Sequence, residues 1–115
     1  MATTFNESEL LERVDNDIGF LAETVQMLES DGRTLLADIE KALAAGDSAA
    51  VGRAAHALKG MVSNFCASEA QECALTIERA GKAGDLAGAP AALQTARTLV
   101  DALTAELVAF VKARS

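Results

Sequence analysis

Apolar residues in the first half of the chain recur with the period of an α-helix. Between residues 17 and 45 they are Ile18, Leu21, Val25, Leu28, Leu35, Ile39 and Ala42. Residues spaced in this way share one face of a helix. The pattern therefore predicts a long helix over about 17–45, bent or briefly broken around Ser30-Asp31-Gly32 and ended by Gly46-Asp47.

The rest of the chain predicts four further helical segments. Asn6, with Glu9 three positions on, is a capping pair for a short helix over about 7–13. The same apolar period predicts longer helices over about 48–65, 68–83 and 89–113, the last with Pro90 in its first turn. The inward faces are expected to carry Val51, Ala55, Leu58, Val62, Phe65, Ala70, Cys73, Ala74, Ile77, Ala80, Leu93, Ala96, Leu99 or Val100, Leu103, Leu107 and Phe110. Phe5 and Phe20 are expected to pack in the core or at its ends.

Composition agrees with an all-α fold, because the chain has one proline and neither tryptophan nor tyrosine. A length of 115 residues suits one domain over 1–115. Four long amphipathic helices with short connections predict an up-down antiparallel four-helix bundle with a short additional N-terminal helix. Each helix uses its one apolar face inside the bundle, so we expect a monomer, although a twofold dimer stays open.

The net charge of -7 disfavours nucleic acid and anionic membranes as partners, because both attract basic surfaces. No apolar run reaches the roughly 20 residues of a membrane span, and the N-terminus does not resemble a signal peptide. We therefore expect a cytoplasmic protein with a protein partner, and whether it is free-standing or a domain of a larger kinase stays open. Cys66 and Cys73 are too far apart for a C-x-x-C pair, which predicts two buried, reduced thiols and no metal site.

His56 is the only histidine, and the helical period directs it about 140° away from the inward face of its helix. We therefore expect an exposed imidazole. Gly52 and Gly60 lie one turn to either side, and each costs about 1 kcal/mol relative to alanine inside a helix. We interpret the two glycines as leaving the imidazole open to the backbone of a partner.

The residues around His56 are basic. Arg53 and Lys59 lie three positions before and after it, and residues 48–68 contain none of the 17 acidic residues of the chain. Imidazole titrates near neutral pH, so it can serve as a neutral nucleophile in the cell. The two cations could stabilise an anion such as a phosphoryl group on His56 and complement an acidic pocket on a partner. Ser63, one turn beyond Gly60, is a further candidate for contact with phosphate or partner.

The stretch Ala54-Ala55-His56-Ala57-Leu58-Lys59-Gly60 resembles the H-x-L-K-G core of histidine phosphotransfer (HPt) domains. Ala67, Ile77-Glu78 and Gly84-Asp85-Leu86 fall at the downstream spacings of that family without a gap. The resemblance covers nearly the whole chain. Two positions depart from it, because the family usually has glycine in place of Cys66 and a large aliphatic residue in place of Ala70. Glycine would allow a left-handed turn that cysteine resists.

The resemblance implies a four-helix bundle that carries phosphate in a multistep two-component phosphorelay. His56 would accept a phosphoryl group, on Nε2, from an aspartate of a receiver domain and pass it to another receiver. Lys59 would help to hold the phosphate, and Gly60 would leave room for the receiver. The implied partners are receiver domains of response regulators or of a hybrid sensor histidine kinase. No cofactor is expected on this chain, because Mg²⁺ would belong to the receiver.

Other functions stay open beside this one. The chain has no Gly-rich nucleotide loop and no paired acid and base residues, so we expect a carrier and not an enzyme in itself. A helical adaptor that binds through an apolar groove is the main alternative. The phosphoacceptor segment of a sensor kinase is disfavoured, because such segments typically follow histidine with an acidic residue and then proline. A degenerate HPt domain would have lost the histidine.

Overall fold

The computed structural model describes residues 4–115, which form five α-helices and no strand. The helices are α1 (Glu7–Arg13), α2 (Ile18–Ala45), α3 (Ser48–Ser63), α4 (Ser68–Ala83) and α5 (Ala89–Arg114). The prediction of an all-α fold is confirmed. That of a single domain over 1–115 stays a prediction, and residues 1–3 lie outside the described range.

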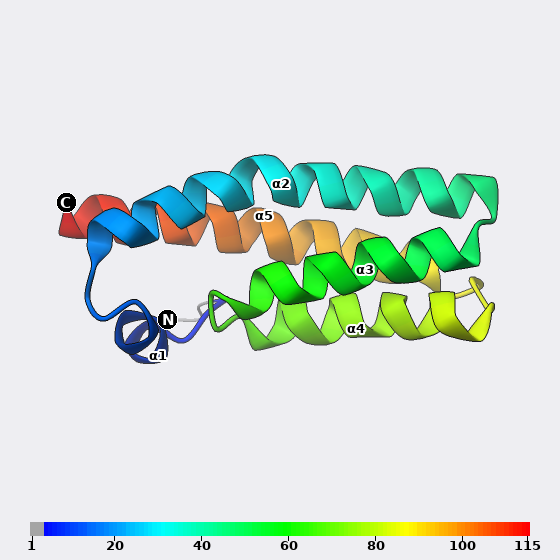
Figure 1. Cartoon of the computed structure of the whole chain (residues 1–115), viewed down its shortest axis with the longest axis horizontal. Helices are drawn as coiled ribbons and strands as arrows, with labels where there is room; N and C mark the ends of the chain where they lie inside the picture. Colours follow the sequence, from blue (N-terminus) through cyan, green and yellow to red (C-terminus); the bar gives the residue numbers. More distant parts are fainter. Residues whose placement is uncertain (1–3) are drawn as a thin grey trace.

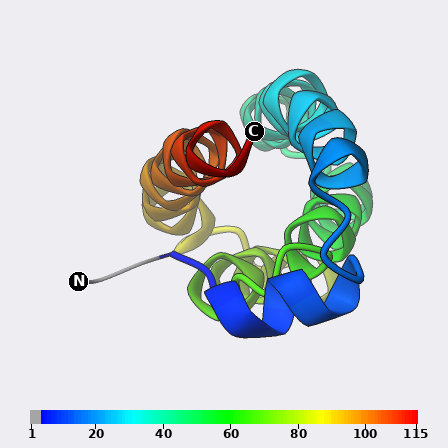
Figure 2. The same ribbon diagram turned by 90° about the vertical axis from the view of Figure 1, so that its left-hand side faces the viewer.

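The four long helices surround one apolar core. Successive long helices run in opposite directions (Figure 1), and the view along the bundle shows them arranged in a ring (Figure 2). In this ring α2 contacts α3 and α5, and α4 contacts the same two helices. Helix α1 lies across the end of the bundle at which α3 ends and α4 begins (Figure 1). Among residues 4–115, no helix has the length and apolar character needed to cross a membrane.

Local signals in the sequence explain where most helices begin and end. The side chains of Asn6, Asp17 and Asp47 accept hydrogen bonds from backbone amides in the first turns of α1, α2 and α3. Gly46 and Gly84 adopt left-handed conformations directly after α2 and α4, with φ of 67° and 71°. These caps satisfy backbone groups that a helix end leaves without partners.

A bend or a brief break was predicted in α2 around Ser30-Asp31-Gly32, and the break is wrong, because the helix is continuous through Gly32. Gly32 is buried, and a Cβ there would lie 3.6 Å from a methyl group of Val100 on α5. The glycine therefore lies on the inward face. Leu36 is buried where Leu35 was expected, and Leu35 packs beside the core.

Helix α3 ends at Ser63, two residues earlier than predicted, although Phe65 is still buried. Cys66 follows in a left-handed conformation with a φ of 57°. Its carbonyl accepts a hydrogen bond from the Asn6 amide, 3.0 Å away, which fastens the start of α1 to this turn. Both cysteines are free, but only Cys66 is buried, so the expectation of two buried thiols is wrong for half-buried Cys73.

Candidate functional site

Helix α3 presents His56 to solvent. Its inward residues Val51, Ala55, Leu58 and Val62 are almost completely buried, whereas the His56 side chain is 67% exposed. The helical period accounts for this contrast, because His56 lies on the side of α3 turned away from the core. The sequence-based placement of His56 is therefore confirmed.

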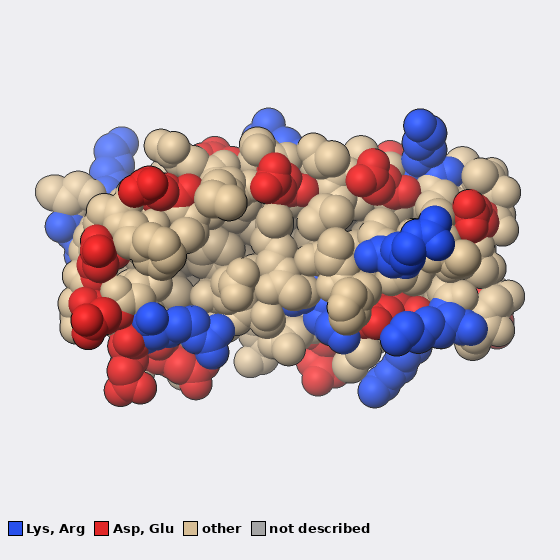
Figure 3. Space-filling model, in the orientation of Figure 1, with Lys and Arg blue, Asp and Glu red and all other residues tan. Residues whose placement is uncertain are grey.

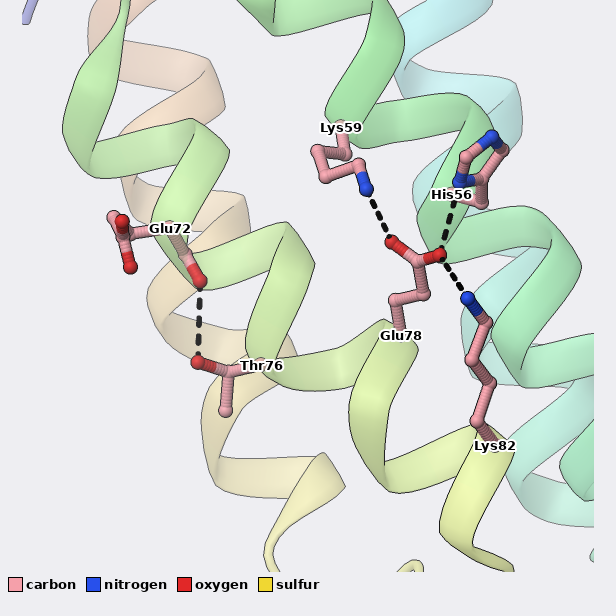
Figure 4. A network of polar contacts seen from close by, with 6 residues as sticks. All are labelled: His56, Lys59, Glu72, Thr76, Glu78 and Lys82. Atoms are coloured by element: carbon pink, nitrogen blue, oxygen red, sulfur yellow. Dashed lines mark hydrogen bonds and ion pairs between the residues drawn. The ribbon is translucent and has the colours of Figure 1, made fainter.

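Glu78 of α4 lies directly beneath the imidazole, and its side chain is only 2% exposed. Nδ1 of His56 is 2.9 Å from Oε2 of Glu78 (Figure 4). Nζ of Lys59 lies 2.7 Å from Oε1, and Nζ of Lys82 lies 2.9 Å from Oε2. One buried carboxylate thus binds the histidine and two lysines.

The lysines keep this carboxylate ionised. Hydrogen bonds from Lys59 and then Lys82 lower the pKa of Glu78 from 4.5 to about 2. Burial acts in the opposite direction, and the hydrogen bond with His56 lowers the pKa further. Glu78 is therefore a carboxylate at neutral pH, which can accept hydrogen bonds but donate none.

An acceptor at Nδ1 determines the state of the imidazole. In a neutral ring one nitrogen carries the proton and the other carries a lone pair. Because Glu78 can only accept, Nδ1 is the protonated nitrogen and donates to Oε2. The lone pair is then on Nε2, which points away from Glu78 (Figure 4). This geometry makes Nε2 the nucleophilic atom.

The two glycines that flank His56 have different surroundings. Gly60 is exposed, and a Cβ there would meet nothing within 4 Å, in keeping with a role in access. Gly52 is buried against α4, where a Cβ would lie 3.7 Å from the backbone nitrogen of Lys82. The interpretation of Gly52 as an opening for a partner's backbone is therefore wrong, because α4 already occupies that side.

The backbones of α3 and α4 approach each other closely at a glycine pair. A Cβ on Gly81 would lie 2.5 Å from the backbone nitrogen of Gly52 and 2.8 Å from the carbonyl oxygen of Ser48. No side chain fits at such distances. The pair brings the backbones together and so places residues 78 and 82 of α4 beside His56.

Arg53 and Ser63 lie on either side of His56 along α3. Arg53 is exposed and, with His56 and Lys82, lines a pocket of about 460 Å³ between α3 and α4. Within residues 4–115 it forms no ion pair. The Ser63 hydroxyl donates to the Gly60 carbonyl at 2.7 Å, and the Ser63 carbonyl accepts from Arg13 at 2.6 Å. Their roles toward phosphate stay predictions.

Sequence reasoning missed two members of this site. Ile77-Glu78 served only as a spacing match, and Lys82 was not considered. Glu78 did carry a signal, since it lies among Ala74, Ile77 and Gly81 on the buried face of α4. Charged residues are seldom fully buried without a partner, so an acidic residue at such a position indicates a buried ion pair.

An apolar surface lies between α2 and α3, near α1. Phe20 and Met27 are 53% and 58% exposed, so the expectation that Phe20 packs in the core or at its ends is wrong. With half-buried Met61 they line a pocket of about 320 Å³ whose floor includes Leu21 and Phe65. We call Phe20, Met27 and Met61 the apolar patch. In the view of Figure 3, acidic side chains lie along α2 and around α1, and a wide uncharged area lies between them.

Comparison with known proteins assigns the chain to a family. The model of the Hpt domain matches residues 23–106. Among solved structures, histidine-containing phosphotransfer protein B (HptB) from Pseudomonas aeruginosa PAO1 has the same fold, with a TM-score of 0.80 and 22% sequence identity over 98% of each chain. No curated protein matches the sequence. Because the family model covers most of the chain, including His56 and Glu78, this protein belongs to the Hpt domain family.

Proposed function

We propose that Nε2 of His56 accepts a phosphoryl group from the aspartyl phosphate of a receiver domain and later transfers it to another receiver. The Nε2 lone pair forms the new bond to phosphorus while the bond from phosphorus to the aspartate oxygen breaks. The aspartate leaves as a carboxylate, and the imidazole becomes positively charged with its proton still on Nδ1. The second transfer reverses these steps.

The observation that carries this proposal is the contact between His56 and Glu78. A buried carboxylate 2.9 Å from Nδ1 keeps the proton on that nitrogen before transfer and stabilises the positive ring afterwards. A surface histidine without a function needs no such partner. The ion pairs of Glu78 with both lysines prevent the carboxylate from taking the proton itself.

We further propose that the receiver docks across the exposed side of α3 and onto the apolar patch. Small residues next to His56, with open space at Gly60, let another backbone approach the imidazole. Exposed apolar side chains such as Phe20 and Met27 provide contact area that excludes water. Mg²⁺ and the phosphorylated aspartate would both belong to the receiver, and a hybrid sensor kinase or a response regulator would supply it.

In this proposal the chain is a carrier and not an enzyme with its own nucleotide site. The up-down antiparallel bundle with its additional N-terminal helix serves as a rigid support, since His56 and Glu78 lie on two adjoining long helices. The monomeric state and the cytoplasmic location stay predictions.

The experiment is transfer of labelled phosphate from a purified receiver domain to this chain, with His56→Gln as the control. We expect label that is stable to alkali and labile to acid on the wild type and none on the variant. A folded wild-type chain that takes no label from a panel of receivers would contradict the proposal. If receivers nevertheless bind both proteins equally, the chain is a helical adaptor.

A further inference from the structure

Lys82 differs from Lys59 in its exposure to solvent and in the oxygen of Glu78 that it contacts. The Lys59 side chain is 25% exposed and lies at Oε1 of Glu78, whereas the Lys82 side chain is 70% exposed and lies at Oε2. That second oxygen also accepts the hydrogen bond from His56. Lys82 is therefore the more exposed of the two lysines, and it shares its acceptor with the ring that reacts.

Phosphorylation would change the charges around that shared oxygen. Transfer to Nε2 leaves the imidazole positively charged, with Nδ1 donating to Oε2. Two cations then compete for one carboxylate oxygen, while two negative charges appear on the other side of the ring. Coulomb attraction weakens with distance and with exposure to solvent, so the exposed ammonium of Lys82 is bound less strongly by Glu78 than the less exposed ammonium of Lys59 is. Of the groups around Glu78, Lys82 therefore gains the most interaction energy by moving to the phosphoryl oxygens.

The backbone places Lys82 where this move is possible. Gly81, the residue before it, contacts Gly52 so closely that a Cβ would lie 2.5 Å from the Gly52 nitrogen. Lys82 and His56 consequently line the same open pocket of about 460 Å³ between α3 and α4. In Figure 4 the Lys82 side chain extends from α4 toward the imidazole. The Glu78 carboxylate lies between Lys59 on one side and His56 and Lys82 on the other.

We propose that Lys82 is a phosphate-binding residue, which pairs with Glu78 in the free protein and binds the phosphoryl oxygens once His56 is phosphorylated. This inference rests on the proposed phosphotransfer function. Lys59 stays at Oε1, so Glu78 remains ionised and continues to hold Nδ1 after Lys82 has left. Phosphorylation of His56 thus exchanges one ion pair of Lys82 for another.

The test uses phosphoramidate, a small donor that needs no docking surface. The bond from its nitrogen to phosphorus breaks, ammonia leaves, and the bond from phosphorus to Nε2 forms. We compare wild type, Lys82→Gln and Lys82→Arg with Arg79→Gln, which removes an exposed positive charge from the same helix that is not among the ion-pair partners of Glu78. Phosphorylation rates are measured at low and high salt. The ³¹P signal of the phosphohistidine is titrated against pH.

We expect Lys82→Gln to slow phosphorylation by about two- to fivefold at low salt, with a smaller effect at high salt, as for exposed ion pairs. Its ³¹P titration should move to higher pH, because a cation near the phosphoryl group favours the fully ionised form. Lys82→Arg should resemble wild type, as should Arg79→Gln. Equal rates and titrations for Lys82→Gln and Arg79→Gln would overturn the role of Lys82. Failure of the wild type to take label from phosphoramidate and from receivers would instead overturn the proposed function.

Discussion

Nδ1 of His56 and Oε2 of Glu78 lie 2.9 Å apart, although the two residues are 22 positions apart in the chain. The first is largely exposed and the second is buried. The contact therefore connects the surface of α3 to a fixed charge inside the bundle. It gives a physical reason why this histidine, and specifically its Nε2 atom, is suited to phosphoryl transfer.

Replacement of Glu78 should slow phosphorylation of His56. Glu78→Gln keeps an acceptor for Nδ1 but removes the charge that stabilises the positive ring, so we expect a loss of several-fold to about tenfold in the rate of transfer from a receiver. Glu78→Ala should lower the rate further, because no carboxylate then holds the proton on Nδ1. In ¹⁵N spectra of the imidazole, less of the proton should be found on Nδ1. Unchanged rates in a folded Glu78→Ala variant would contradict the role of this carboxylate.

The low pKa of Glu78 predicts a loss of stability in acid. The carboxyl has a pKa of about 2 in the folded chain and about 4.5 when it is exposed on unfolding. Its ionised form therefore stabilises the fold fully above pH 4.5, and this contribution declines as the pH falls from about 4.5 to about 2. Urea unfolding across this range should show a steeper loss for wild type than for Glu78→Gln. Parallel curves would contradict the prediction.

Two glycines of the site should respond to alanine in opposite ways. Gly60→Ala adds a methyl group in open space within a helix, so the free energy of unfolding should rise by up to about 1 kcal/mol. Gly81→Ala forces a Cβ against the backbone of α3 and should destabilise the fold by about 1–3 kcal/mol. Thermal unfolding of both variants tests the pair. A stable Gly81→Ala variant would mean that α3 and α4 can separate at little cost.

Cys66 adopts a backbone conformation that suits glycine better. Its φ of 57° costs a residue with a side chain about 1 kcal/mol relative to glycine. Burial and a hydrogen bond with Glu9 raise the pKa of the Cys66 thiol, so replacing the cysteine also removes interactions of the sulfur. The backbone effect is therefore measured by comparing two variants that both lack sulfur. Cys66→Gly should be more stable than Cys66→Ala by about 1 kcal/mol in chemical unfolding. The reverse order would show that the turn tolerates a left-handed alanine.

The apolar patch should matter for receivers and not for small donors. Phe20→Ser combined with Met27→Ser should weaken receiver binding by about tenfold or more, as expected for central apolar contacts. Phosphorylation by phosphoramidate should stay unchanged, because His56 and Glu78 are untouched. Val108→Ser is the matched control, since Val108 is another exposed apolar residue, on α5. Equal receiver affinity of the double variant and the control would place docking elsewhere.

The helices could be read from the sequence because each long one has a single apolar face and clear signals at its ends. Val51, Ala55, Leu58 and Val62 set the rotation of α3, and that rotation alone exposes His56. Cys66 adopts the left-handed conformation that the glycine usual in the family would allow, although cysteine resists it. Periodicity failed at Phe20, whose apolar side chain faces solvent. At Gly32 it correctly predicted a long helix, whereas the local sequence Ser30-Asp31-Gly32 wrongly suggested a break.

The site itself could be predicted only on the helix that carries His56. The absence of acidic residues from 48–68 made the surroundings look wholly basic, because a count along one segment cannot include a side chain from a neighbouring helix. Glu78 and Lys82 enter through the close contact of Gly52 with Gly81, and that contact depends on how α3 and α4 pack. The periodicity of one helix contains no information on this packing.

We propose that Nε2 of His56 carries the phosphate while Nδ1 keeps its proton against Glu78. The most direct measurement is ¹⁵N and ³¹P NMR of the chain after phosphorylation by a receiver. We predict coupling of phosphorus to Nε2 and a protonated Nδ1. Phosphorus coupled to Nδ1, or phosphate on any residue other than His56, would contradict the account.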